Sequence, residues 1–478
     1  MIGWFIAIIV FLLLYSAQSV AIVWIERRLP AKATAWVFIS LAVPVLGFAC
    51  YWMIGRSRRV HAGRNISREY EQAAERLSIC AESVGELGQT GMLQRDQLLG
   101  LLRVCSGRPV TLGNQVKVLT NGRETFASIL EEMERASHHI HLDYYTIRDD
   151  EIGRKFLHVL TAKAKAGIEV RVLYDGIGSV HLSKRYVSEL KQSGARVECF
   201  LPAGTALFKR LLNSRNHSKI AVIDGKVGFV GGINIGDEYL GKDKRLGFWR
   251  DTQLRLEGDA VYFLQELFMK DWELAAKERL PVNAGYMPEH DPDEALQEPV
   301  LIVSSGPDRS GEPILETAFA SVTAATTSIS ISTPYFIPDE SLLAALGSAA
   351  KSGVDVRLII PGIADTQLVL WATLSFVERM LAAGVRVYRY QKGFIHAKVM
   401  IVDDLLAIVG TANMDMRSFH SNFEQNAVLF DHGTISRLKQ DFEQDLLDSR
   451  ELDLESFRQR QAKEKAAEAA ARLLAPLL

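Results

Sequence analysis

The chain repeats one short phrase at a fixed distance, and this repeat limits its fold more than any other feature. Residues 216–224 read NHSKIAVID, and residues 395–403 read IHAKVMIVD. The histidines, lysines and aspartates of the two phrases are each 179 positions apart, as are the GGIN and GTAN phrases that follow them at 231–234 and 410–413. Self-similarity in one register indicates two copies of a single folding unit.

Each copy alternates short apolar runs with helical stretches. Residues 170–173 and 356–360 are short, apolar and preceded by an amphipathic stretch that ends in glycine. This alternation is typical of α/β domains with a largely parallel or mixed sheet. Asp224-Gly225 lies between two apolar runs and predicts a hairpin turn. We therefore predict an α/β fold with two repeated sandwich domains related by a pseudo-twofold axis.

Two uncharged apolar runs precede the repeat. Residues 2–25 and 33–55 are 24 and 23 residues long, and a helix needs about 20 apolar residues to cross a bilayer. A cleavable signal peptide would need a basic segment before the first run, and it would leave the second run unexplained. We predict a transmembrane helical hairpin with both chain ends on one side. Five arginines between residues 56 and 68 outnumber the three basic residues of the turn, which favours a cytoplasmic body.

Composition gives the remaining boundaries. The break between the repeats is expected in the proline- and acid-rich residues 288–299. The predicted units are the hairpin at 1–59, a connecting region at 60–112 with a helical stretch near 69–87, the first domain at 113–290, the second domain at 291–450 and a helical tail at 451–478.

Composition also excludes several classes of protein. Lys+Arg 55 against Asp+Glu 57 gives a net charge of −2, which disfavours a protein whose main task is to bind nucleic acid. A hydrophobic content of 48% excludes a disordered chain. The four cysteines form no C-x-x-C pair and are too few for a disulfide scaffold.

The repeated phrase carries a catalytic pattern. Residues i and i+2 of a strand point to the same face, so His217 projects with Lys219 and His396 projects with Lys398. A single such pair is usually a surface histidine beside a solvated lysine, but two pairs in register are not explained that way. If the copies associate, one pocket holds two imidazoles and two ammonium groups, which suits a nucleophile and a proton donor acting on a phosphodiester.

The aspartates of the phrase have a different position. Asp224 and Asp403 lie five residues beyond the lysines, at an odd spacing that turns them away from the pocket. We include them in the catalytic motif but assign them a structural role.

With the pattern H-x-K-x4-D-x6-G-[GST]-x-N present twice, the chain resembles the phospholipase D superfamily. Further phrases are similar to those of bacterial cardiolipin synthases: YY at 144–145, GGINIGDEY at 231–239, TPYF at 333–336, RSF at 417–419 and NFE at 422–424. The resemblance covers nearly the whole chain. Ser218 departs from it, because a basic residue is expected there.

The resemblance implies a phosphatidyl transfer in which two phosphatidylglycerol molecules give cardiolipin and glycerol at a bacterial inner membrane. It implies that His217 attacks, forming a phosphatidyl-histidine, and that His396 protonates the departing glycerol and later deprotonates the incoming hydroxyl. No metal or other cofactor is expected, since the lysines supply the positive charge. The groups expected to neutralise the phosphoryl oxygens are Lys219, Lys398, Asn234 and Asn413.

Each imidazole also needs an acceptor that holds its second nitrogen. The repeat offers Asp251 after the first motif and Glu424 after the second, in matching segments. We expect these carboxylates to orient the histidines; the alternative is a pair of ordinary acids at a strand edge.

Two other segments allow competing interpretations. Residues 206–212 mix apolar residues with two cations, as expected either of a lipid-surface segment or of an amphipathic core helix. His139, His141 and Asp143 alternate along a strand, but the second repeat has serines there, which favours the polar face of a strand over a metal site.

Three alternative functions use the same features. A nuclease is disfavoured by the apolar runs, and a non-enzymatic scaffold by the completeness of both motifs. A hydrolytic phospholipase D differs only in its product, phosphatidic acid. The sequence leaves open the strictness of donor and acceptor, the leaflet used and the oligomeric state, a homo-oligomer included.

Overall fold

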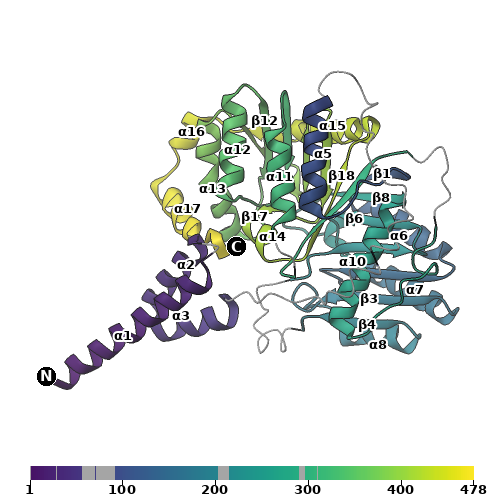
Figure 1. Cartoon of the computed structure of the whole chain (residues 1–478), viewed down its shortest axis with the longest axis horizontal. Helices are drawn as coiled ribbons and strands as arrows, with labels where there is room; N and C mark the ends of the chain where they lie inside the picture. Colours follow the sequence, from purple (N-terminus) through teal and green to yellow (C-terminus); the bar gives the residue numbers. More distant parts are fainter. Residues whose placement is uncertain are drawn as a thin grey trace.

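The computed structural model describes residues 2–27, 30–55, 70, 92–202, 215–289, 297–308 and 311–477. Two sheet-containing halves lie side by side, and an N-terminal group of helices projects from one of them (Figure 1). The predicted residues 206–212 and most of the helical stretch near 69–87 lie outside the described residues.

The first half is built on a seven-stranded sheet. Its last three strands are parallel to one another, and the others pair antiparallel. In spatial order the strands are β1 (Asn114–Thr120), β8 (Thr252–Gly258), β6 (Val227–Gly231), β5 (Lys219–Ile223), β2 (His139–Tyr144), β3 (Glu169–Asp175) and β4 (Arg196–Phe200).

The second half repeats this order in an eight-stranded sheet. The strands are β19 (Ser449–Glu451), β13 (Arg386–Tyr390), β12 (Asp355–Pro361), β10 (Ser328–Ser332), β15 (Val399–Val402), β16 (Leu406–Gly410), β18 (Glu424–Leu429) and β9 (Val300–Ser305). Apart from the added edge strand β19, each strand has its counterpart in the first sheet. The predicted repeat of mixed α/β domains is therefore confirmed.

Helices cover the outer faces of both sheets (Figure 1). Those of the first half are α6 (Asn121–Arg135), α7 (Glu151–Lys165) and α8 (Lys184–Gln192). Those of the second half are α11 (Pro313–Thr323), α12 (Glu340–Lys351) and α13 (Gln367–Ala382), joined by α5 (Met92–Ser106), which precedes the first half in sequence. A third core lies between the halves and includes residues of both sheets, α10 (Ala260–Ala276) and α15 (His432–Leu447). Burial of this shared core holds the inner faces of the two sheets together.

The hairpin predicted at the first motif is also confirmed. β5 and β6 pair antiparallel with Ile220 opposite Val230. Asp224 opens the turn at φ 55°, in the left-handed region that aspartate tolerates better than most residues.

The N-terminal helices differ from the predicted pair of spans. The first run forms one helix, α1 (Ile2–Ile25). The second run is broken into α2 (Pro30–Ala42), α3 (Pro44–Cys50) and a π-helical turn, η1 (Tyr51–Gly55). Val43 leaves helical geometry at φ −138°, and the break follows because proline at 44 has no N–H to continue the α2 ladder.

The C-terminal tail is helical, as predicted, and it packs onto the body. It comprises α16 (Leu454–Arg458), α17 (Ala462–Leu474) and η4 (Ala475–Leu477). Phe457 and Ala471 join the core of the second half, while Leu477 packs against the buried cluster of the N-terminal helices. The tail therefore links the second half to those helices.

Candidate active site

The two motif histidines lie just before equivalent strands, at the interface of the halves. His217 precedes β5, and His396 lies between β14 (Gly393–Ile395) and β15. The backbone N–H of His217 donates to Phe423 O (3.0 Å), and that of His396 donates to Arg250 O (2.7 Å). Each histidine is therefore held by a segment of the opposite half.

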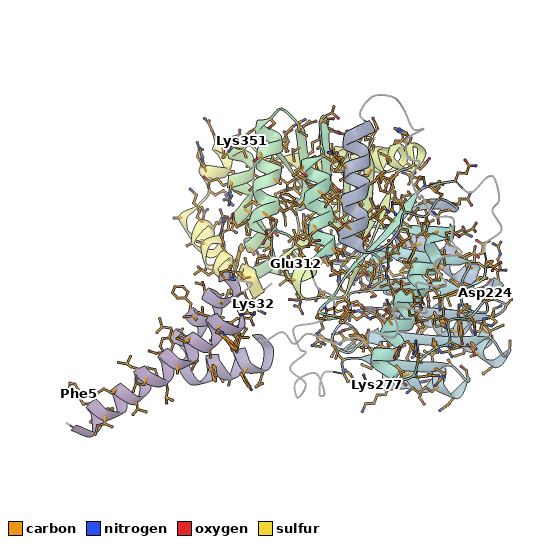
Figure 2. The ribbon with its side chains drawn as sticks, in the orientation of Figure 1. Phe5, Lys32, Asp224, Lys277, Glu312 and Lys351 are labelled. Atoms are coloured by element: carbon orange, nitrogen blue, oxygen red, sulfur yellow. The ribbon has the colours of Figure 1, made fainter. Side chains whose placement is uncertain are left out.

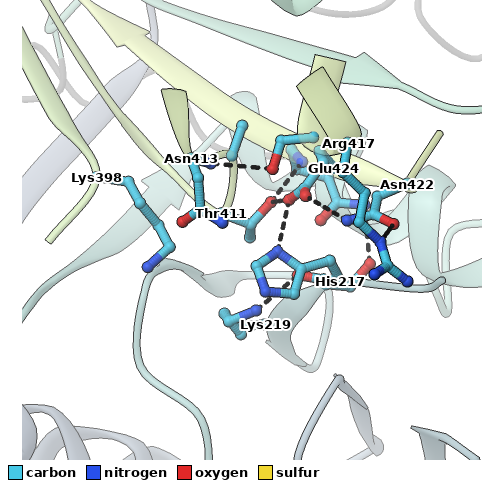
Figure 3. Close-up of polar contacts among 12 residues, drawn as sticks. His217, Lys219, Lys398, Thr411, Asn413, Arg417, Asn422 and Glu424 are labelled. Atoms are coloured by element: carbon cyan, nitrogen blue, oxygen red, sulfur yellow. Dashed lines mark hydrogen bonds and ion pairs between the residues drawn. The ribbon is translucent and has the colours of Figure 1, made fainter. Parts of the chain in front are cut away.

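These backbone contacts bring a carboxylate from each half beside the histidine of the other half, an arrangement that we call the exchange of carboxylates. Glu424 follows Phe423, and its Oε2 lies 2.9 Å from Nδ1 of His217 (Figure 3). Asp251 follows Arg250, and its Oδ2 lies 2.8 Å from Nδ1 of His396. Each carboxylate thus contacts the histidine of the other motif.

The close approach on the second side depends on a glycine. β14 pairs in parallel with β7 (Phe248–Arg250), placing Ile395 opposite Arg250. A Cβ on Gly393 would lie 2.0 Å from Phe248 O, a distance that no larger residue can satisfy without moving one of the strands. Gly393 therefore allows the pairing that brings His396 to Asp251.

The lysines fold back onto their own histidines. Lys219 Nζ donates to His217 O (2.8 Å), and Lys398 Nζ donates to His396 O (2.5 Å) and lies 3.1 Å from His396 Nε2. Both lysines are buried. Figure 3 draws Lys219 and Lys398 in one close-up with His217.

Burial dominates the electrostatics of the four basic groups. It lowers the pKa of His217 and of His396 to about 4, because the charged imidazolium loses its solvation. It lowers the pKa of Lys219 to about 7 and that of Lys398 to about 8, although Glu424 and Asp251 act in the opposite direction on both lysines. Each lysine is within electrostatic range of the carboxylates of both halves, so the two motifs form one cluster.

The carboxylate beside His217 is ionised and fully bonded. Burial opposes ionisation of Glu424, but His217, Lys219 and Thr411 overcome it and hold its pKa below the ordinary value. Thr411 Oγ1 donates to Oε2 (2.5 Å), and Asn422 Nδ2 donates to Oε1 (3.2 Å). An imidazole whose Nδ1–H donates to this carboxylate keeps the lone pair of Nε2 free.

The two histidines differ at Nε2. Among the residues that the structure describes, no hydrogen bond is made by Nε2 of His217, whereas Nε2 of His396 faces Lys398 Nζ. The His217 side chain is also slightly more exposed, at 12% against 9%. Of the two imidazoles, His217 is therefore the one whose Nε2 has no hydrogen-bond partner within the described residues.

The motif aspartates lie at the far ends of the motif strands. Asp224 accepts from the backbone N–H groups of Ser137, His138 and His139. Asp403 accepts in the same way from the backbone N–H groups of Thr326, Thr327 and Ser328, the matching residues of the second half. Both aspartates fix the strand that runs beside the motif, as the odd spacing predicts.

The predicted asparagines are already bonded to protein. Asn234 Nδ2 donates to Tyr239 Oη (2.5 Å), and its Oδ1 accepts from Thr146 N (3.1 Å). Asn413 Nδ2 donates to Asp415 Oδ2 (3.0 Å). Each amide keeps at most one N–H for a phosphoryl oxygen, so their predicted role as donors stays a prediction.

Several residues around His217 were not predicted as site residues, although Tyr145 and Arg417 lie in the phrases YY and RSF. Tyr145 lies edge-on to the imidazole, with ring centroids 4.9 Å apart, and Lys219 Nζ lies 5.4 Å from the same ring. Arg215 is buried, with its Nη1 3.9 Å from Asp175 Oδ2. The positive charge of Arg417 acts to lower the pKa of both Arg215 and Tyr145. The signal for Arg215 was present in the sequence: it continues the i, i+2 alternation of His217 and Lys219 backwards by one step.

The histidines of β2 take part in packing. His141 stacks on Phe268 at 4.2 Å between centroids, Gln265 lies 2.9 Å from its Nδ1, and Arg171 contacts its Nε2 at 3.3 Å. Within the described ranges, no group of three or more His, Cys, Asp or Glu residues could hold a metal ion.

Comparison with known proteins identifies the family. The family model "Cardiolipin synthase, PLD-like domain" matches residues 129–272 and 319–446. A cardiolipin synthase of Geobacillus sp. (strain WCH70) is 44% identical over 96% of this chain and 91% of its own length. The major cardiolipin synthase ClsA of Bacillus subtilis (strain 168) is 40% identical over 98% of both chains.

Among solved structures, a phosphatidylserine synthase from Haemophilus influenzae Rd KW20 shares the fold. Its TM-score is 0.63 at 14% identity, over 80% of this chain and 100% of the other. At that identity the likeness concerns the fold alone.

Proposed function

Because the chain belongs to the cardiolipin synthase family of phospholipase D-like proteins, we propose that it transfers a phosphatidyl group from one phosphatidylglycerol to another. The products are cardiolipin and glycerol. The observation that carries the proposal is the exchange of carboxylates, since it joins both His-Lys pairs in one buried cluster at the interface.

In the first half-reaction, Nε2 of His217 attacks the phosphorus of the donor lipid. The bond from phosphorus to the glycerol oxygen breaks, and His396 gives a proton to that oxygen. The two lysines neutralise the phosphoryl oxygens, and the negative phosphodiester raises the pKa of both lysines and of His396 above their values in the empty site. The result is a phosphatidyl-histidine and free glycerol.

In the second half-reaction, the hydroxyl of another phosphatidylglycerol gives its proton to His396 and attacks phosphorus. The phosphorus–nitrogen bond breaks, and His217 returns to its starting state. Glu424 and Asp251 hold the two imidazoles in the tautomers that these steps require. Exclusion of water by the buried site favours the lipid alcohol over hydrolysis.

The proposal extends to the location of the protein, to its domain bounds and to an alternative reaction. We place the enzyme in the bacterial inner membrane with its body in the cytoplasm, since more basic residues follow the second apolar run in the sequence than lie in the turn between the runs. We also retain residues 113–290 and 291–450 as the two domains. The alternative function is a hydrolytic phospholipase D, which would use the same groups with water as acceptor.

Product analysis tests the proposal. Full-length protein in vesicles containing phosphatidylglycerol labelled in both headgroup and acyl chains should release glycerol and cardiolipin in equal amounts. Phosphatidic acid as the main lipid product would assign the protein to the hydrolases instead. His217→Ala and His396→Ala should each abolish turnover, while His158→Ala, an exposed histidine on α7, should leave it unchanged.

A further inference from the structure

The second apolar run folds back on itself. Tyr51 packs against Trp36 at 5.6 Å between ring centroids, and a Cβ on Gly47 would lie 2.8 Å from Ile39 O. These contacts run antiparallel on either side of Pro44, so α2 and α3 form a tight helical hairpin, hereafter the α2–α3 hairpin (residues 30–55). Glycine at 47 is what permits the close approach.

The hairpin is too short to cross a bilayer. α2 has 13 residues, which is about 20 Å of helix, against a hydrocarbon core of about 30 Å. α1 has 24 residues, or about 36 Å, and is the one helix of the described chain that is long and apolar enough to span.

The open end of the hairpin lies at the body. Tyr51 Oη donates to Glu26 Oε1 (3.3 Å) in the turn after α1, and Lys32 Nζ lies 3.2 Å from Glu26 Oε2. Lys32 also shares a small pocket with Arg417, His420 and Leu477 of the body. Figure 2 shows Lys32 where the N-terminal helices meet the body and Phe5 at the far end of α1.

The closed end points away from the body and is apolar. Tyr15 Oη contacts Val37 O (3.3 Å), so the tip of the hairpin reaches only part of the way along α1. At the tip, Leu41 and Leu46 are 57% and 64% exposed, and Phe5 beyond it is 71% exposed. Apolar side chains exposed to this degree around a helix are what a lipid-facing segment presents.

Charge agrees with this arrangement. α1 contains no basic residue, whereas Arg27 and Lys32 lie at its body end. The described hairpin ends at Gly55, and the sequence continues into Arg56, Arg58 and Arg59. The turn and the end of the hairpin therefore carry positive charge on one side of the membrane, which the predicted pair of spans would have divided between two sides.

We propose that α1 alone crosses the membrane and that the α2–α3 hairpin is a wedge inserted among the acyl chains of the leaflet that faces the catalytic body. The N-terminus then lies on the side opposite the body. The partner of this surface is the hydrocarbon of one lipid monolayer, and the hairpin turns within it at Pro44.

The wedge also determines which leaflet supplies substrate, an extension that rests on the proposed function. Arg417, which shares the pocket with Lys32, donates to Asn422 Oδ1 (3.4 Å). Asn422 in turn bonds Glu424, the partner of His217. The reacting histidine therefore lies only a few side chains from the headgroup level of the body-side leaflet, and lipid enters from that leaflet.

Cysteine accessibility in intact spheroplasts tests the topology. In full-length protein whose native cysteines are replaced by serine, single cysteines at Gly3→Cys, Arg27→Cys and Lys244→Cys are exposed to a membrane-impermeant maleimide. Gly3→Cys should react from outside, whereas Arg27→Cys and the body control Lys244→Cys should react only after permeabilisation. External reaction of Arg27→Cys, or protection of Gly3→Cys, would overturn the proposal.

A distance measurement tests the fold of the hairpin. Spin labels at Thr34→Cys and Met53→Cys would be about 29 Å apart on a continuous helix, and should be far closer in the wedge. A separation near the continuous-helix value would refute the inference.

Vesicles with the body outward then test the leaflet. Phosphatidylglycerol confined to the outer leaflet should be converted, and phosphatidylglycerol confined to the inner leaflet should not. Conversion of inner-leaflet lipid alone would refute the choice of leaflet. Absence of conversion from both would instead refute the proposed function, while the labelling pattern would still decide the topology.

Discussion

The exchange of carboxylates between the halves makes a prediction about which half-reaction each carboxylate supports. Glu424 bonds His217, the proposed nucleophile, and Asp251 bonds His396, the proposed acid. Glu424→Gln and Asp251→Asn are matched variants, since each keeps the size of the side chain and removes its charge. The prediction is that only Glu424→Gln impairs attack on phosphorus.

The magnitude follows from the contacts of Glu424. A hydrogen bond to a charged group contributes about 1.5–3 kcal/mol, which corresponds to a loss of about 10- to 150-fold in rate. An amide can also present its NH₂ group to Nδ1, which shifts the imidazole proton to Nε2 and removes the attacking lone pair. The loss with the wrong tautomer reaches about 10⁴-fold in a serine protease, so a fall of at least about 100-fold is expected.

The assay uses phosphatidyl-p-nitrophenol, whose leaving group needs no proton. His396 and Asp251 then become dispensable for the first half-reaction, and the burst of p-nitrophenol reports attack by His217 alone. Glu424→Gln should lose the burst, whereas Asp251→Asn should keep its rate within about tenfold of the parent enzyme. If Asp251→Asn lost the burst and Glu424→Gln kept it, each carboxylate would serve the histidine of its own repeat and the reasoning would fail.

Three further predictions concern charge and stability. The lysines must be protonated to bind the phosphodiester, and His217 must be neutral to attack. With phosphatidyl-p-nitrophenol, which needs no proton from His396, kcat/KM should therefore fall above pH 7–8, through the pKa values of Lys219 and Lys398, and below about pH 4; a flat profile between pH 6 and 9 would contradict this. The folded-state pKa of Lys219, about 7, lies below the ordinary 10.5, so the unfolded chain binds the extra proton, and stability rises with pH between these values. Lys219→Met should accordingly raise Tm at pH 7 and abolish turnover, and a lower Tm would show that the ammonium stabilises the empty site. Asp224→Ala should lower the free energy of unfolding by about 1–3 kcal/mol with activity per folded molecule retained, as thermal melting and turnover on one sample would show; loss of activity without loss of stability would place Asp224 in the chemistry.

Local pattern was enough to predict much of the fold. The constant 179-residue offset predicts two equivalent units, and the matching strand orders of the two sheets confirm it. The i, i+2 spacing of His217 and Lys219 places both groups at one site because strand geometry has a fixed period. The odd spacing turns Asp224 away from that face by the same period, and its separation of five residues from Lys219 places it at the far end of the strand.

The N-terminal region shows where local pattern fails. Residues 33–55 have the length and apolarity of a membrane span. Hydropathy averages over a window, so it does not detect the single residue that breaks the helix. Pro44 ends α2, and Gly47 lets α3 pack back against Ile39. Both residues are visible in the sequence, but only the packing decides that the chain reverses there.

The sequence by itself determined the chemistry of this protein: two imidazoles, two ammonium groups and two carboxylates in a repeat whose members are recognisable one by one. Only the tertiary structure decided which carboxylate serves which histidine. Spacing along the chain fixes only the direction in which side chains point within one strand. Phe423 pairs with the segment before His217, and Arg250 pairs with the segment before His396, because the two halves associate. Contacts of that kind join residues 207 and 145 positions apart, beyond the reach of any local period.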